Sequence, residues 1–248
     1  MFWPQEEIVY PLHFKRMNVR IDDALRTIRG FLDSVDRPYV SVSWGKDSIV
    51  VMDLCYRVRP IPVIWVDRGR GGDIPATLDV VAHYEDAGYD IRRIPTPMSI
   101  MDLHRRYSID ELERGGHIPK MLKETFRDAE RDFDGSLWGI RAEESPARKK
   151  MARGKGKIFR RRSGLLVCSP ILGWTARDVW AYIHGRGLRY SAAYDMLAAG
   201  PMDRERLRQS NVAGIVNIGN GRMSELKRLA PDIYQELAEI RPEIKGFP

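Results

Sequence analysis

The fold of this chain is indicated by the stretch Tyr39-Val40-Ser41-Val42-Ser43-Trp44-Gly45-Lys46-Asp47-Ser48, which is followed by an apolar run from Ile49 to Val58. Residues that favour β-structure lead into a short turn of small and charged residues, and the apolar run continues directly from that turn. This order predicts a buried strand, a tight turn and the first turn of a buried helix.

The turn has the residues that a phosphate site needs. A helix start leaves backbone N–H groups unpaired and carries the positive end of the helix dipole, so it stabilises an anion. Gly45 lets the backbone approach the anion, Lys46 adds a positive charge, and Ser43 and Ser48 supply hydroxyl donors. Asp47 is expected either near a bound Mg²⁺ or as a helix cap. The spacing differs from the usual P-loop, and the alternative is an ordinary turn with a solvent-facing lysine.

The rest of the chain continues the alternation of strands and helices. Further strands are expected at residues 61–66, 89–94, 136–140 and 165–168, and helices at 18–35, 74–87, 174–183 and about 231–240. This alternation predicts βαβ units and a parallel sheet.

The domain organisation follows from the same pattern. Residues 96–133 lean towards helix and are interpreted as an insertion beside the site, while residues 211–221 mix small and polar types. The simplest interpretation is one α/β domain over residues 1–200, with a C-terminal helical extension over residues 201–248 packed on it.

Composition excludes several classes of function. No apolar run approaches the roughly 20 residues that span a bilayer, and the start of the chain lacks a signal-peptide pattern, so a cytoplasmic location is expected. Cys55 and Cys168 both lie in apolar runs, no Cys-x-x-Cys pair occurs, and the five histidines are scattered. A transition-metal site held by the protein is therefore not expected.

Positive charge is concentrated in one stretch of a chain whose formal net charge is +7. Between Glu144 and Asp178 there is no acidic residue, whereas nine cations crowd residues 148–162: Arg148, Lys149, Lys150, Arg153, Lys155, Lys157, Arg160, Arg161 and Arg162. Two glycines and few hydrophobic residues indicate a flexible loop rather than a packed helix. The stretch either meets a polyanion such as DNA or RNA or forms a solvated lid over the phosphates of a nucleotide.

Two further strand ends carry residues suited to a ligand site. Asp67 ends the second strand, and ligands bind at the carboxyl ends of parallel strands, so Asp67 is expected near the loop at Lys46. There it would help to hold Mg²⁺ or a ribose hydroxyl, or it would only start a turn. The strand at 136–140 delivers Arg141 to the same edge, and arginine suits bidentate phosphate contact.

Four blocks together resemble the PAPS reductase-like family of ATP pyrophosphatases, in the adenine nucleotide alpha-hydrolase superfamily. The blocks are Ser43–Ser48, Asp67, Gly139–Ser145 and Pro170–Trp180, and the resemblance covers about residues 38–195. It implies a five-stranded parallel sheet flanked by helices, with ATP bound at the loop.

The resemblance also implies roles for single residues. Those expected to bind the nucleotide are Ser43, Trp44, Gly45, Lys46, Asp47, Ser48, Asp67, Gly139, Arg141 and Arg148. Lys46, Asp47 and Arg141 are the expected catalytic residues, with Mg²⁺ near Asp47.

The chain also departs from the family pattern. PAPS reductases attack with a cysteine in a C-terminal motif, and no cysteine follows Cys168; the paired cysteines of APS reductases are missing as well. Without a thiolate nucleophile, sulfite-releasing reduction lacks its chemical agent. We therefore expect an enzyme that cleaves ATP between the α and β phosphates, adenylates an acceptor and releases pyrophosphate.

The motifs leave the acceptor open. Relatives suggest sulfate, with a GTPase partner, or a DNA backbone in phosphorothioation, with sulfur from a cysteine desulfurase; tRNA-thiolating members usually carry cysteines that this chain lacks. The basic stretch favours DNA or RNA over sulfate. A nucleotide-binding subunit without turnover of its own, and assembly into an oligomer, also stay open.

Overall fold

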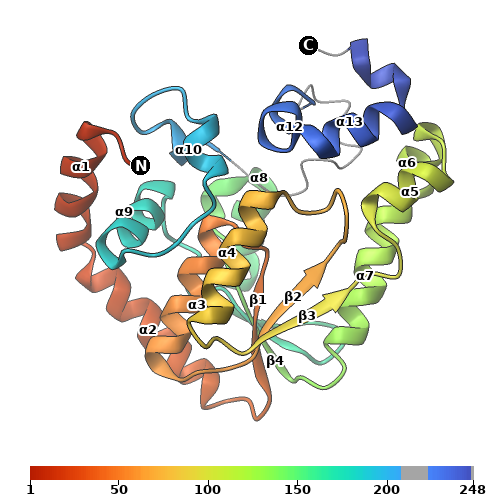
Figure 1. The fold of residues 1–248 in the computed structure, drawn as a ribbon. Helices are drawn as coiled ribbons and strands as arrows, with labels where there is room; N and C mark the ends of the chain where they lie inside the picture. The colour runs from red at the N-terminus through yellow and green to blue at the C-terminus, as the bar shows by residue number, and fades with distance from the viewer. Residues whose placement is uncertain (208–222, 247–248) are drawn as a thin grey trace.

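Helices and strands alternate along the chain in the computed structural model, which describes residues 1–207 and 223–246 (Figure 1). The strands are β1 (Pro38–Val42), β2 (Val63–Asp67), β3 (Ile91–Pro95), β4 (Gly135–Trp138), β5 (Ile158–Arg160) and β6 (Leu166–Cys168). The helices up to the end of β4 are α1 (Pro4–Lys15), α2 (Asn18–Leu32), α3 (Lys46–Val58), α4 (Pro75–Asp86), α5 (Ile100–Arg106), α6 (Ile109–Gly115) and α7 (His117–Ala129). Those after it are α8 (Pro146–Lys155), α9 (Ala176–Arg186), α10 (Ala193–Leu197), α12 (Met223–Leu229) and α13 (Pro231–Ile240), with short 3₁₀ turns η1 (Ala142–Glu144), η2 (Asp203–Glu205) and η3 (Pro242–Gly246).

The six strands form one sheet in the order β3-β2-β1-β4-β6-β5. All neighbouring pairs are parallel except β5 and β6, which are antiparallel. The predicted α/β fold with a parallel sheet is confirmed. The sheet has one strand more than the five expected, because β5 adds an antiparallel edge.

Helices cover both faces of the sheet. The main core joins residues of α2, α3, α4 and α9 to β1 and β2, with α1 packed on the outside of α9, while α7 contacts β2 and β3 from the other face (Figure 1). All five residues of β2 are buried, as are four of the five in β1. Such near-continuous burial is typical of parallel strands with helices on both sides.

The predicted helices are confirmed within a few residues. They correspond to α2, α4, α9 and α13, and the side chain of Thr175 caps α9 by accepting a hydrogen bond from the N–H of Asp178. Helix α1 was not predicted. It has no single apolar stripe, since Ile8 and Leu12 are exposed while Glu6 and Tyr10 are buried, so its sequence lacks helical periodicity.

The expectation of a flexible loop in the basic stretch is wrong. Residues 146–155 form α8, which Ser145 caps by accepting a hydrogen bond from the N–H of Arg148, and Gly156 ends the helix with φ +68°. Strand β5 then pairs with β6. The capping signals Ser145-Pro146 and Gly156 were present in the sequence, but the density of charge concealed them.

The C-terminal helices complete a second core. Leu226 of α12 and Leu237 of α13 belong to one apolar cluster with Ile100 and Leu103 of α5. In the view of Figure 1, α12 and α13 lie above the sheet, over the ends of β2 and β3. The predicted mixed segment at 211–221 lies outside the described residues. Among the helices that are described, none is both long and apolar enough to cross a bilayer.

Candidate nucleotide-binding site

The predicted turn joins β1 to α3 as expected, with an unusual backbone at Trp44. Trp44 has φ 57°, in the left-handed region that favours glycine. Its side chain is fully buried, stacked on Tyr84 and edge-on to Trp65. The side chain of Trp44 is therefore a core residue, and only its backbone is left to face a ligand.

Hydrogen bonds within the turn hold its shape. Gly45 is the N-cap of α3, and the Ser48 hydroxyl donates to the Gly45 carbonyl at 2.9 Å. The N–H of Ser43 donates to the same hydroxyl oxygen at 3.3 Å. Ser48 thus closes the turn from inside, in addition to any contact with a ligand.

Gly139 lies against the start of α3. A Cβ at Gly139 would lie 2.6 Å from the N of Ser48 and 2.7 Å from the C of Asp47. Because both contacts are backbone atoms, no side-chain movement relieves them. The end of β4 and the start of α3 therefore meet backbone to backbone, which requires glycine.

The three residues predicted to be catalytic form a chain of charges at the start of α3. Nζ of Lys46 lies 3.3 Å from Asp47 Oδ2, and Nε of Arg141 lies 2.5 Å from Asp47 Oδ1. The side chains of both cations are 4% exposed. The structure brings these residues together and pairs them with one another, so an incoming anion competes with the Asp47 carboxylate.

Arg141 is held in place by the turn that follows it. Its N–H donates to Oε2 of Glu144 at 2.9 Å, and its Nη1 lies 3.3 Å from Oε2 of Glu143. Glu144 also pairs with Arg148 at the start of α8. Glu143 and Glu144 therefore hold Arg141 in place, and Glu144 also holds Arg148.

Lys46 also contacts a segment far along the chain. Its N–H donates to the Tyr194 hydroxyl at 3.3 Å, and its Nζ donates to the Leu207 carbonyl at 3.3 Å. Burial, followed by the nearby Asp47 charge, raises the pKa of Tyr194, so the phenol stays protonated.

A pocket of about 400 Å³ opens beside this loop. It lies between the ends of β1 and β4, where the strand order reverses direction, which is the position at which open α/β sheets bind ligands. Its volume falls in the range of about 300–1,000 Å³ that is usual for small-molecule sites. Four residues predicted to bind the nucleotide line it: Ser43, Ser48, Gly139 and Arg148. Trp44, Gly45, Lys46, Asp47, Asp67 and Arg141 do not line it.

Several lining residues were missed by sequence reasoning. Lys123 and Phe126 come from α7, Glu130 follows it and Trp138 ends β4, while Arg161 was predicted only as part of the basic stretch. Glu130 accepts hydrogen bonds from Arg161, at 2.8 and 2.9 Å, and from the Tyr39 hydroxyl at 2.8 Å. The apolar pattern of α7 indicates a helix, but nothing in it says which face meets the site.

Asp67 is engaged in a turn and an ion pair. Its Oδ1 accepts from the N–H of Gly69 at 2.9 Å, and its Oδ2 lies 2.8 Å from Arg93 on β3. This geometry matches the alternative in which Asp67 starts a turn. Its contact with a nucleotide stays a prediction.

The residues at the loop do not fit a Mg²⁺ site of their own. Both oxygens of Asp47 are taken by cations, and among the described residues no group of three or more metal-ligating side chains occurs. Mg²⁺ prefers several oxygen ligands in octahedral geometry. A Mg²⁺ ion near Asp47 stays a prediction.

Both cysteines are buried, as their positions in apolar runs indicate. Burial raises the pKa of the Cys55 thiol well above its usual value and that of Cys168 to about 12. Because the thiolate is the reactive form of cysteine, neither side chain is a nucleophile here.

Several known proteins are similar to this chain in sequence. The chain is 28% identical to an adenosine 5'-phosphosulfate reductase of Geobacillus kaustophilus over 166 residues, which covers 64% of this chain and 68% of that protein. It is 28% identical to sulfate adenylyltransferase subunit 2 of Mycobacterium tuberculosis over 200 residues, covering 69% of this chain and 62% of the subunit.

A solved structure and a family model extend these similarities. The crystal structure of a phosphoadenylyl-sulfate reductase from Candida auris, in complex with phosphate, matches 77% of this chain and 94% of its own with a TM-score of 0.57 at 18% identity, which shows a shared fold. The model of the phosphoadenosine phosphosulfate reductase domain matches residues 37–197, which hold β1 to β6 and the whole pocket wall. The chain therefore belongs to the phosphoadenosine phosphosulfate reductase domain family.

Proposed function

We propose that this protein cleaves ATP between the α and β phosphates and transfers the adenylyl group to an acceptor. The observation that carries the proposal is the pocket between β1 and β4, which meets the start of α3 at Ser43, Ser48 and Gly139. A nucleotide base would lie in the pocket near Phe126 and Trp138, with its phosphates directed towards α3, because a helix start stabilises anions.

The chemistry requires positioning and charge rather than a covalent intermediate. An acceptor oxygen forms a bond to the α-phosphorus, the bond from that phosphorus to the α–β bridging oxygen breaks, and pyrophosphate leaves with the electron pair. Lys46 and Arg141 would stabilise the developing negative charge, with Asp47 holding both cations in place. Arg148, on the pocket wall, would contact the phosphates.

Reduction of a sulfonucleotide by a thiol of this chain is disfavoured. Its only thiols are Cys55 and Cys168, and both are buried with raised pKa values. ATP is therefore a better substrate for this site than a sulfonucleotide. The similarity to sulfate adenylyltransferase subunit 2 supports adenylyl transfer.

For the acceptor, we infer a nucleic acid from the basic stretch. Six of its cations are exposed, and within residues 1–207 and 223–246 they lie in no ion pair: Lys149, Lys150, Arg153, Lys155, Arg160 and Arg162. Arg148 and Arg161 of the same stretch line the pocket. The exposed charges thus adjoin the pocket, as a polyanionic acceptor such as the DNA of a phosphorothioation system requires.

Two other functions each have an observation in their favour. Similarity to sulfate adenylyltransferase subunit 2 favours sulfate as acceptor, with a GTPase subunit as partner. The internal pairing of Lys46 and Arg141 favours a nucleotide-binding subunit that turns over only within a complex.

Incubation with α-labelled ATP and Mg²⁺ tests the proposal, with pyrophosphate release and the fate of labelled AMP as readouts. We expect Lys46→Ala to lower pyrophosphate release by about 100-fold or more, since it removes a preorganised charge from the transition state. Lys15→Ala, at an exposed lysine of α1, should keep the wild-type rate. Normal turnover by a folded Lys46→Ala protein would disprove the proposed site.

The species that carries AMP separates the acceptors. Labelled AMP on added DNA or RNA supports a nucleic-acid acceptor, whereas labelled adenylyl sulfate supports the sulfate enzyme. ATP binding without pyrophosphate release, with DNA, RNA and sulfate each present, would favour the non-catalytic subunit.

A further inference from the structure

The segment from Ala193 to Leu207, which holds α10 and η2, contacts the phosphate loop at two points. We propose that this segment is an autoinhibitory strap, which shields Lys46 and must move before an anion reaches it. The inference rests on the proposed function, because it concerns access to the same loop.

The strap supplies an oxygen to each of two donors on Lys46. The Tyr194 hydroxyl accepts the hydrogen bond of the Lys46 N–H, and the Leu207 carbonyl accepts that of Nζ, both at 3.3 Å. A phosphate at the start of α3 would present oxygens to the same donors. Lys46 itself is 3% exposed. The two oxygens therefore stand where those of a bound anion would stand.

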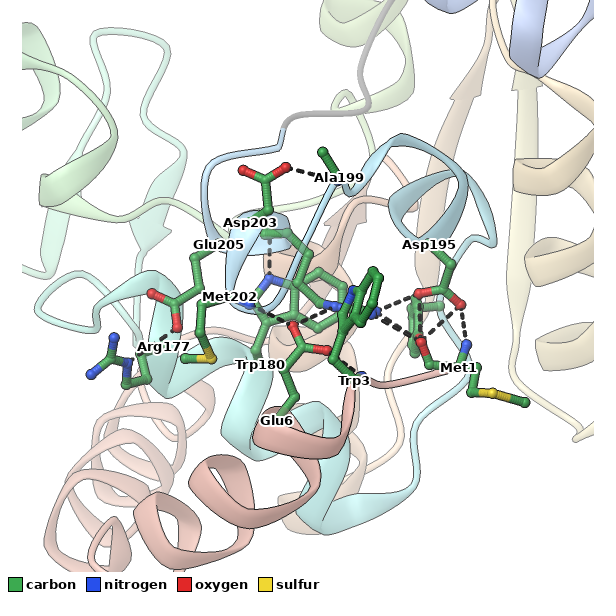
Figure 2. Close-up of polar contacts among 12 residues, drawn as sticks. Met1, Trp3, Glu6, Arg177, Trp180, Asp195, Ala199, Met202, Asp203 and Glu205 are labelled. Carbon is green, nitrogen blue, oxygen red and sulfur yellow. Dashed lines mark hydrogen bonds and ion pairs between the residues drawn. The ribbon is translucent and has the colours of Figure 1, made fainter.

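A buried arginine fastens the strap to the first helix. Arg204 is fully buried, and its Nε lies 2.9 Å from Oε1 of Glu6, while its Nη1 pairs with Asp195 and lies 3.2 Å from the Tyr190 hydroxyl. The same Oε1 of Glu6 accepts from the N–H of Met202 at 3.0 Å. In Figure 2 the carboxylates of Glu6, below, and of Asp195, at the right, are directed towards the centre of the view.

The cluster is tied to the main core as well. The Trp180 ring N–H donates to the Arg204 carbonyl at 3.0 Å (Figure 2). Without the Glu6 charge, the buried Arg204 would keep its ion pair with Asp195 but lose the one to α1. The contacts of Arg204 therefore set how often the strap leaves the loop. The apparent affinity for an anion becomes weaker as the fraction of molecules with a closed strap rises.

Chemical labelling of lysines tests the strap without any nucleotide. With sulfosuccinimidyl acetate and mass spectrometry, we expect Lys46 to react at least about tenfold more slowly than exposed Lys15 in the wild-type protein, because acylation requires local opening. Glu6→Gln, which removes a charge-assisted bond to Arg204, should accelerate labelling of Lys46 by about tenfold and leave Lys15 unchanged. Fast labelling of Lys46 in the wild type, or no acceleration in folded Glu6→Gln protein, would overturn the proposal.

ATP binding provides a second test that does not depend on Glu6. Tyr194→Phe removes the competing oxygen and should tighten ATP binding by roughly 2- to 10-fold, the net worth of one hydrogen bond. Tyr56→Phe is the matched control, because the Tyr56 hydroxyl also accepts a backbone N–H, that of Asp90, at the far end of α3. Its affinity should equal that of the wild type.

The two proposals fail in different ways. Unchanged or weaker ATP binding by Tyr194→Phe, while the wild type binds ATP, overturns the strap and leaves the proposed function intact. Absence of ATP binding in every variant contradicts the proposed function, and the labelling rates of Lys46 then decide the strap by themselves.

Discussion

Trp44, in the turn between β1 and α3, has a left-handed backbone conformation that favours glycine. A left-handed conformation costs an L-residue on the order of 1–2 kcal/mol. Burial of the Trp44 ring against Tyr84 and Trp65 offsets that cost, because a buried tryptophan removes a large apolar area from water. The loop is therefore anchored by its own core residue, while its neighbours Ser43 and Ser48 line the pocket.

Replacement of Gly139 tests the close approach between the end of β4 and the start of α3. Gly139→Ala places a methyl group against the backbone of Asp47 and Ser48, so we expect a loss of about 1–3 kcal/mol in stability. Weakened ATP binding should accompany this loss, because the start of α3 must shift. Denaturant unfolding and calorimetric titration with ATP measure the two effects.

Gly154→Ala is the matched control, since a Cβ there, in the last turn of α8, meets no atom within 4 Å. It should raise stability by up to about 1 kcal/mol, as alanine favours a helix over glycine. Equal effects of the two substitutions would refute the close approach at Gly139.

At the scale of elements, α9 shows how one carboxylate organises a helix start. Asp178 is fully buried and accepts from the Thr175 N–H at 2.7 Å, while His13 of α1 and Arg20 of α2 each lie 2.6 Å from its Oδ1. Burial by itself would raise the pKa of Asp178, but these hydrogen bonds and charges outweigh it and lower the pKa below its usual value. Three helices thus converge on one carboxylate.

This lowered pKa predicts a pH dependence of stability. In the unfolded chain Asp178 binds a proton near its ordinary pKa of about 3.9, whereas the folded protein binds it only at lower pH. The stabilisation is therefore present above about pH 4 and is lost as the pH falls through the folded-state pKa. Asp178→Asn should cost about 1–3 kcal/mol at pH 7 and flatten the acid limb of the stability curve.

Urea unfolding between pH 3 and pH 7 measures this effect. Asp86→Asn, at an exposed carboxylate in the last residue of α4, serves as the control and should leave the curve nearly unchanged. An acid limb that is as steep in Asp178→Asn as in the wild type would show that other groups cause it.

At the scale of the whole molecule, the sheet edge brings the basic stretch to the pocket. Strand β5 pairs with β6 at the edge of the sheet, and three cations are fixed by acidic partners from other elements: Arg148 by Glu144, Lys157 by Asp23 and Arg161 by Glu130. These ion pairs hold the basic stretch as an ordered surface, although its composition suggests disorder. Within residues 1–207 and 223–246 the remaining exposed cations of the stretch lie in no ion pair, and we expect them to meet a polyanion.

Nucleic-acid affinity and its salt dependence test this surface. The triple variant Lys149→Glu, Lys150→Glu and Arg153→Glu should weaken binding of a DNA duplex and lower the slope of log K against log salt by about 3, one for each lost phosphate contact. Fluorescence anisotropy over a salt series measures both quantities.

A variant with the same net charge provides the control. Lys15→Glu, Arg92→Glu and Lys245→Glu change exposed residues scattered over other elements and should alter the slope much less. Equal slopes for both triple variants would show that net charge, rather than this surface, attracts the nucleic acid.

The sequence by itself determined the parallel sheet, the tight turn between β1 and α3 and the association of Lys46, Asp47 and Arg141. Strand and helix periodicity, cap residues and the shared carboxyl edge of parallel strands are local or follow from simple topology, so they are visible in one chain. Only the tertiary structure decided the far wall of the pocket at Phe126, the burial of the Trp44 side chain and the contact of Leu207 with Lys46. These depend on which face of a helix meets the site and on contacts between residues about 160 positions apart, and neither leaves a periodic signal in the sequence.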